Sequence, residues 1–155
     1  MVTMKKSLVA AGVALSLGVG YSMGAFAQAN PAAVVKQRQA GMTLIAKYFG
    51  PLGGMAAGRV PFDAAVVTRN AGYLDVLSKT PWDGFIQATS GEKSGALPKV
   101  YEDAAGFKAA QDRFQNEVTK LVAASKGGNE AAVKAAAGEV GKTCGGCHDT
   151  YRAKP

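Results

Sequence analysis

Apolar side chains recur at intervals of three and four residues along four segments of this 155-residue chain. This spacing places them on one face of an α-helix, whereas a half-buried strand would alternate apolar and polar residues. Glycine and proline separate the four segments, which we expect at residues 31–49, 61–77, 99–125 and 129–152. Four amphipathic helices with mostly short loops favour an all-α fold, an antiparallel up-down-up-down four-helix bundle.

Local signals set the expected helix boundaries. Gly50-Pro51 predicts the end of the first helix, because proline lacks the amide hydrogen that a helix interior needs. Pro61 predicts the start of the second helix, since proline is favoured in a first turn. Asn129 is a good N-cap for the fourth helix. Residues 84–98 contain three glycines and a proline, and we expect an irregular connection there.

The residue counts exclude several kinds of protein. The chain is 48% hydrophobic and 19% charged, which is typical of one globular domain and not of a disordered chain. Two cysteines cannot form a disulfide scaffold. The single histidine excludes every site that needs two imidazoles.

The first 27 residues have the three parts of a secretory signal peptide. Lys5 and Lys6 precede an apolar stretch at residues 7–21, and residues 25–27 form an A-x-A cleavage site. The apolar stretch is shorter than the ~20 residues that span a bilayer as a helix. We therefore expect cleavage after Ala27, a mature domain over residues 28–155 with no membrane segment, and export to a bacterial periplasm.

The charge of the mature chain is modest. The whole chain carries a formal net charge of +7, and without the two lysines of the leader 16 basic residues remain against 11 acidic ones. These basic residues are scattered along the sequence and not clustered with aromatic residues, as they usually are in a nucleic-acid interface. We expect no nucleic-acid partner.

Both cysteines and the only histidine fall in one run, Cys144-Gly145-Gly146-Cys147-His148. The pattern C-x-x-C-H is the attachment signature of c-type haem. Two thiols add to the two vinyl groups of the porphyrin, and the adjacent imidazole ligates the iron. On a helix, Cys144 and His148 share a face. We predict one covalently bound haem c, with thioethers at Cys144 and Cys147 and His148 as axial ligand.

Two other uses of the motif fit less well. A structural zinc site needs four ligands, and this chain offers two cysteines and one histidine. A thiol–disulfide redox centre would place its cysteines at a helix N-terminus, where the helix dipole lowers a thiol pKa. Here about four helical turns of pattern precede Cys144.

A sixth iron ligand would have to come from upstream, because only seven residues follow His148. The mature chain has two methionines, and Met42 lies on the apolar face of the first predicted helix whereas Met55 lies in a glycine-rich stretch. Met42 is therefore the expected occupant of the distal side. No acid–base group is placed beside it, so we expect no enzymatic activity. Two functions stay open, gas binding at a five-coordinate iron and electron transfer with Met42 and His148 as axial ligands.

The sequence resembles the cytochrome c′ family, the high-spin class of c-type cytochromes. The resemblance covers nearly the whole mature chain. It rests on the residues Arg-Gln-Ala-Gly-Met-Thr-Leu at 38–44, Pro81-Trp82, Phe107, and Cys-Gly-Gly-Cys-His-Asp-Thr-Tyr-Arg at 144–152.

The resemblance implies further roles. Arg38 and Gln39 would lie near the haem propionates, Met42 would occupy the distal position, and Arg152 would flank His148 on the proximal side. It also implies a homodimer formed through the first two helices and a five-coordinate, high-spin iron. Such an iron would bind NO and CO, resist O₂, and exchange single electrons with an unidentified redox partner protein.

Overall fold

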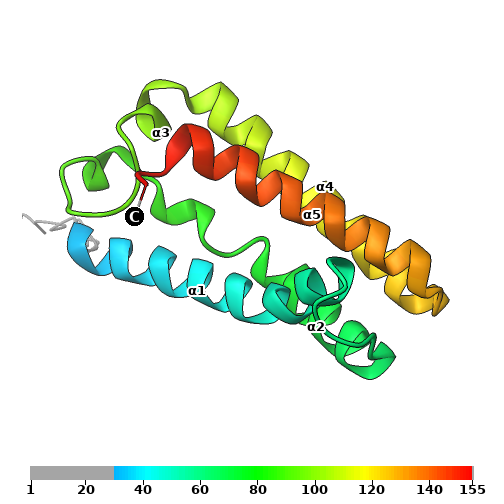
Figure 1. The fold of residues 1–155 in the computed structure, drawn as a ribbon. Helices are drawn as coiled ribbons and strands as arrows, with labels where there is room; N and C mark the ends of the chain where they lie inside the picture. The colour runs from blue at the N-terminus through cyan, green and yellow to red at the C-terminus, as the bar shows by residue number, and fades with distance from the viewer. Residues whose placement is uncertain (1–29, 155) are drawn as a thin grey trace, which may run out of the picture.

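The computed structural model describes residues 30–154, and within this range the chain forms the expected up-down-up-down bundle (Figure 1). A short helix and two 3₁₀ turns occupy the connection between the second and third long helices. Each long helix packs chiefly against its two neighbours in the bundle. The elements in chain order are α1 (Pro31–Ala56), α2 (Ala64–Leu77), η1 (Trp82–Gly84), η2 (Gln87–Thr89), α3 (Lys99–Glu102), α4 (Ala104–Gly127) and α5 (Glu130–Tyr151).

The predicted end of the first helix at Gly50-Pro51 was wrong, because α1 continues to Ala56 with Pro51 in its interior. A proline inside a helix costs about 3 kcal/mol. The continuation buries Leu52 and Met55, which are 1% and 5% exposed. Burial of a leucine or methionine side chain contributes about 1.5–3 kcal/mol each, which offsets the cost of the proline.

The helix N-caps show where local signals succeeded and where they failed. Asn129 caps α5 as expected, and its side chain accepts a hydrogen bond from the amide of Ala132 at 2.9 Å. The second helix begins at Ala64 and not at Pro61, because the carboxylate of Asp63 caps it. A capping carboxylate satisfies amide hydrogens that have no partner within the helix, so it fixes the start of the helix more strongly than a nearby proline.

The third predicted helix is divided in two at Asp103. α3 ends at Glu102, and Asp103 adopts a non-helical conformation and caps α4. Its carboxylate accepts a hydrogen bond from the amide of Gly106 at 3.0 Å. The chain therefore changes direction at Asp103, which brings residues 99–102 against the end of α5.

The main core lies between all four long helices. Its members are almost fully excluded from solvent and include Leu52, Val67, Leu74, Val118, Leu121, Val133 and Val140. A second, smaller cluster contains Val100, Ala110 and Tyr151, with Phe85, Phe107 and Cys147 packed against it. The second cluster joins the connection between α2 and α4 to the end of α5.

None of the helices within residues 30–154 is long and apolar enough to cross a membrane. The predicted signal peptide and its cleavage after Ala27 lie outside the described residues.

Candidate haem site

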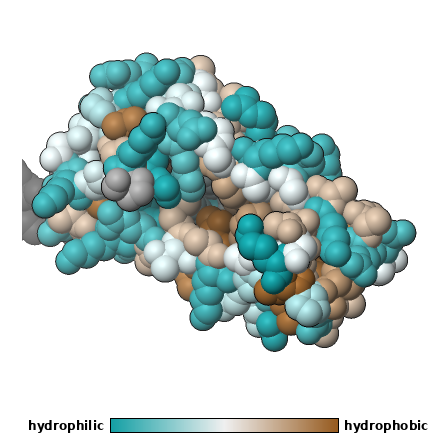
Figure 2. Space-filling view, viewed as in Figure 1, coloured by the Kyte–Doolittle hydropathy of each residue, from teal (hydrophilic) through white to brown (hydrophobic). Residues whose placement is uncertain are grey.

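A cavity of about 770 Å³ lies between α1 and α5, at the end of the bundle that contains the smaller cluster. Its volume falls within the roughly 300–1,000 Å³ of cofactor and small-molecule sites. Figure 2 shows the hollow on this face of the molecule, with hydrophobic side chains at its floor. Most of the lining is apolar or aromatic and includes Met42, Ile45, Phe49, Trp82, Phe85, Val100, Phe107 and Phe114.

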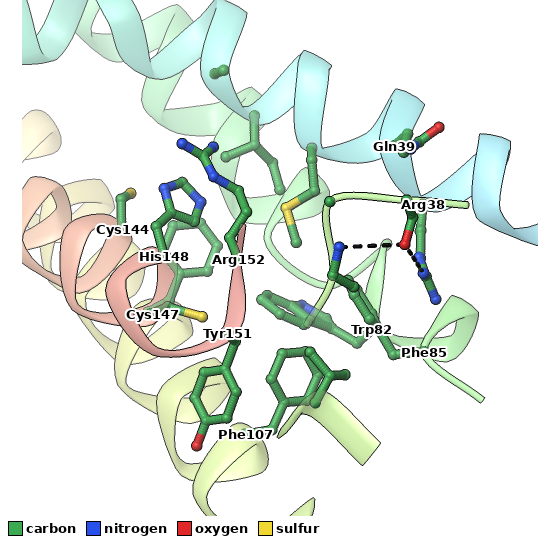
Figure 3. Close-up of a pocket in the computed structure, with 18 of the residues that line it drawn as sticks. Arg38, Gln39, Trp82, Phe85, Phe107, Cys144, Cys147, His148, Tyr151 and Arg152 are labelled. Carbon is green, nitrogen blue, oxygen red and sulfur yellow. Dashed lines mark hydrogen bonds between the residues drawn. The ribbon is translucent and has the colours of Figure 1, made fainter. Parts of the chain in front are cut away.

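The structure brings the three residues of the attachment motif to this cavity. Cys144, Cys147 and His148 all line it, and the last two turns of α5 carry them. Figure 3 shows Cys147 and His148 projecting from α5 beside Arg152. Both cysteines are free thiols and half-buried. The two intervening glycines, Gly145 and Gly146, face open space, so no side chain obstructs this part of the helix.

Burial controls the protonation of these groups in the chain without cofactor. Burial raises the pKa of both thiols, and for Cys147 the charge of Arg113 partly opposes this rise. Burial also lowers the pKa of His148, and the nearby guanidinium of Arg152 lowers it further. The imidazole is therefore neutral at physiological pH and keeps the lone pair that a metal ligand needs.

The opposite wall of the cavity comes from α1. Met42 is half-buried and lines the cavity, whereas Met55 is 5% exposed and packs in the main core. Met42 is thus the methionine that this fold presents to the cavity. Gln39 also lines the cavity but is exposed on α1, so it lies at the rim.

Arg38 lies on the same face of α1 and is only 3% exposed. Its guanidinium lies 4.3 Å from the centre of the Phe85 ring. It donates four hydrogen bonds to the connection between α2 and α4, to the Gly84 carbonyl (2.7 Å) and the hydroxyls of Thr89 (2.8 Å), Tyr101 (3.1 Å) and Ser94 (3.1 Å). Sequence reasoning missed these partners, because they lie 46 to 63 positions away along the chain.

The hydrogen bonds of Arg38 satisfy only part of its donor capacity. A guanidinium has five N–H groups. The bonds to the connection use Nη1 and Nη2, and within residues 30–154 no carboxylate forms an ion pair with Arg38. A buried charge without a counter-charge is costly, so a negatively charged group of a bound molecule would find a partner here.

The prediction that Arg152 belongs to the last helix was wrong. α5 ends at Tyr151, and Arg152 is extended (φ −121°, ψ 135°) in an isolated antiparallel bridge with Ala96. The amide of Leu97 donates to the Tyr151 carbonyl, and the amide of Ala153 donates to the Gly95 carbonyl, both at 2.9 Å. The Arg152 amide still donates to the His148 carbonyl (3.1 Å), and the next amide, that of Ala153, bonds to the distant segment in place of the helix. Figure 3 shows the guanidinium of Arg152 beside the His148 ring.

A four-helix bundle whose last helix presents two thiols and an imidazole to an apolar cavity defines a class of c-type haem proteins. The comparisons agree with this class. The sequence profile described as Cytochrome C' matches residues 33–152. The chain therefore belongs to the cytochrome c′ family, whose members bind c-type haem.

Several relatives align over nearly their whole length. The chain is 46% identical to cytochrome c′ of Rubrivivax gelatinosus over 126 residues, which is 81% of this chain and 98% of the relative. The crystal structure of that protein superimposes with a TM-score of 0.77. Variants of cytochrome c prime from Alcaligenes xylosoxidans, 41% identical, were solved with nitric oxide (TM-score 0.75) and with carbon monoxide (0.74), and in each case 81% of this chain and 98% of the variant are covered.

The residues present fit a haem c. Two thiols and one neutral imidazole lie along one edge of a cavity of suitable volume, and the rest of the wall is largely apolar. The tetrapyrrole would be in contact with aromatic side chains, among them Trp82, Phe107 and Phe114. The bound haem supplies an iron centre for ligand binding and one-electron chemistry.

Proposed function

We propose that this protein binds NO and CO at a five-coordinate, high-spin haem c iron whose protein ligand is His148. The observation that carries the proposal is the composition of the wall opposite α5. That wall presents the apolar Met42, Ile45 and Phe49 to the cavity, and the lining residues within 30–154 include no carboxylate and no second imidazole. The polar residues of α1 in the lining are Arg38 and Thr43, which already donate hydrogen bonds within the protein, and Gln39 at the rim. The NO and CO complexes of the Alcaligenes xylosoxidans relatives support it.

The polarity of this wall favours some diatomic molecules over others. NO and CO bind reduced iron well without polar assistance, whereas bound O₂ needs a hydrogen-bond donor beside it. Peroxide chemistry needs a positioned acid–base residue, and the α1 side of the cavity provides none among its lining residues. We therefore propose gas binding and one-electron redox cycling with a partner protein, and not catalysis.

A second candidate function is electron transfer at a six-coordinate, low-spin iron. The observation that favours it is the position of Met42, whose thioether is half-buried in the wall that faces the motif. A methionine ligand opposite a histidine raises the reduction potential of haem iron. A methionine that does not bind is a flexible apolar group that fills space.

Replacement of Met42 separates the two functions. For gas binding, Met42→Ala should keep a five-coordinate spectrum and bind CO faster, because a bulky group leaves the distal side. For electron transfer, Met42→Ala and Met42→Leu should both abolish a low-spin spectrum and lower the potential. Met55→Leu is the matched control, because Met55 packs in the main core. Unchanged CO kinetics in Met42→Ala would contradict the placement of Met42 over the iron.

We further propose roles for the polar residues around the cavity. Cys144 and Cys147 carry the thioethers, and Arg38 uses its remaining donors for a haem propionate, with Gln39 assisting from the rim. The burial of Arg38 without a carboxylate partner among the described residues supports this role. Arg152 flanks His148 on the proximal side, as its contact with the cavity suggests.

We also propose a homodimer formed through α1 and α2. Three large apolar side chains are exposed on these helices, Leu44 (41%), Tyr73 (46%) and Val76 (65%). The ring of Tyr73 lies 4.6 Å from that of Tyr48 of α1, centre to centre, with the two planes tilted by 48°, so the two helices share this face. Sedimentation of the purified protein measures its oligomeric state directly, and Val76→Glu should give monomers.

We propose as well that the protein is exported to the periplasm and cleaved after Ala27. Mass spectrometry of the mature protein should then give a chain that begins at Gln28.

A further inference from the structure

The residues of the connection between α2 and α4 contact both walls of the cavity. Ser94, Gly95, Ala96 and Leu97 form a strap from α1 to the end of α5. At one end of the strap, the Ser94 hydroxyl accepts hydrogen bonds from Arg38 (3.1 Å) and from the Ala96 amide (3.3 Å). At the other end, the strap pairs with residues 151–153 through two backbone hydrogen bonds.

A second contact fixes the same end of α5. The hydroxyl of Tyr151 donates a 2.8 Å hydrogen bond to Oδ2 of Asp103, and Oδ1 of Asp103 accepts from the Gly106 amide. Tyr151 is 7% exposed and packs its ring 5.2 Å from that of Phe107. The hydrogen bond from Tyr151 lowers the pKa of Asp103, so this carboxylate is ionised at neutral pH and accepts both bonds.

The fold makes room for this contact at one glycine. A Cβ at Gly106 would collide with both carboxylate oxygens of Asp103 and would lie 2.6 Å from the Tyr151 hydroxyl. Flexible side chains can move away from such a collision, but the Tyr151–Asp103 bond cannot then keep its geometry. The Tyr151–Asp103 hydrogen bond therefore requires glycine at position 106, although Gly106 does not line the cavity.

We propose that Asp103 and Tyr151 form a latch that fixes the end of α5, and that this latch positions His148 and Arg152 in the haem site. Tyr151 is three residues beyond His148, so the latch holds the helical turn that carries the imidazole. Arg152 follows directly, and its extended backbone depends on the strap that pairs with residues 151–153. Asp103 and Tyr151 are positioning residues, and the inference rests on the haem site proposed above.

The latch restrains movement of the histidine along the axis of α5. Any ligand exchange that displaces His148 must also displace the last turn of the helix, which Asp103 ties to the start of α4. Without the latch, the turn and the strap can shift together. Tyr151 itself lines the cavity, whereas Asp103 and Gly106 are not among the lining residues. Residues that act on a site without touching its ligand change binding by roughly two- to thirty-fold.

Tyr151→Phe in the haem-loaded mature protein is the first test. It removes one hydroxyl and keeps the ring, and Gly106→Ala breaks the same bond while it keeps both partners. We expect both variants to change the CO association rate by at least about twofold. We also expect faster hydrogen exchange at the amides of Leu97 and Ala153, which measures the latch independently of gas binding. The matched controls are Tyr48→Phe and Gly72→Ala, which lie outside the cavity lining and outside the latch.

The outcomes separate the latch from a purely structural contact. Faster exchange together with altered CO rates, in both latch variants and in neither control, supports the proposal. Faster exchange with unchanged CO rates and an unchanged reduction potential overturns it, as does unchanged exchange in Tyr151→Phe. If Gly106→Ala does not fold, Tyr151→Phe decides alone. A low-spin spectrum of the parent protein would contradict the proposed function, and the exchange rates and potential would still test the latch.

Discussion

The two ends of the bundle are held together by different forces. At the closed end, away from the cavity, the helices meet through side chains such as Leu52, Leu121 and Val133, which are 0–3% exposed. At the haem end, the walls stand apart around the cavity, and single polar residues tie them together. Arg38 ties α1 to the connection, and Asp103 ties α4 to the end of α5.

The difference shows how one small domain keeps both a stable fold and an open site. Apolar packing at the closed end is distributed over many side chains, so each helix is fixed by several neighbours. At the haem end, the two walls do not pack directly on each other across the cavity, so they share fewer apolar side-chain contacts. Directional hydrogen bonds from buried groups hold the walls at a distance instead, and each of them depends on one or two residues.

Loss of the cofactor should have the largest effect, and it should be confined to the haem end. In Cys144→Ala/Cys147→Ala we expect no haem that resists extraction. Without the haem, the apolar side chains of both walls lack the partner that would bury them, and burial of each such side chain contributes about 1.5–3 kcal/mol. Hydrogen exchange should therefore rise sharply at residues 82–103 and 144–153. Equal protection from hydrogen exchange at both ends would contradict the expectation that only the haem end depends on the cofactor.

A cavity cut into the closed end should destabilise the whole fold without altering the site. Leu121 is fully buried in the main core, and Leu121→Ala should lower the free energy of unfolding by about 3–4 kcal/mol. The absorption spectrum and the CO association rate should stay as in the parent. Urea unfolding and stopped-flow CO binding measure the two effects, with Val60→Ala, at a residue that is 44% exposed, as the control. A changed CO rate would show that the two ends are coupled.

Loss of the hydrogen bonds that join two walls of the cavity should lower the free energy of unfolding less, and it should also change CO binding. Arg38→Met removes four hydrogen bonds, and we expect the free energy of unfolding to fall by about 2–3 kcal/mol. Exchange should accelerate in residues 84–101, and the CO rate should change. Lys36→Met on the exposed face of α1 is the matched control. An unaltered CO rate in Arg38→Met would restrict Arg38 to a structural role.

Much of this arrangement follows from local patterns. Helical periodicity identified the four long helices and the up-down-up-down bundle, and Asn129 marked the start of α5. The attachment motif required no tertiary information, because its three residues fall within five positions of one helix. The face of α1 that carries Arg38 and Met42 also followed from spacing, and both line the cavity.

The errors arose where distant segments compete with local preference. Pro51 should end a helix, but the burial of Leu52 and Met55 in the main core continues it. Arg152 should extend the last helix, but the pairing of its neighbours with the strap makes its backbone extended. In both cases the deciding contact comes from a segment far away in the sequence.

The sequence by itself determined the class of fold, the cofactor and the position of the C-x-x-C-H motif, because periodicity and motif spacing are short-range properties of the chain. The tertiary structure alone decided which residues join the walls of the cavity. The four partners of Arg38 and the Tyr151–Asp103 bond join residues 46 to 63 positions apart. Such bonds form only where the packing of the helices brings the donor and the acceptor together, and no local sequence pattern predicts them.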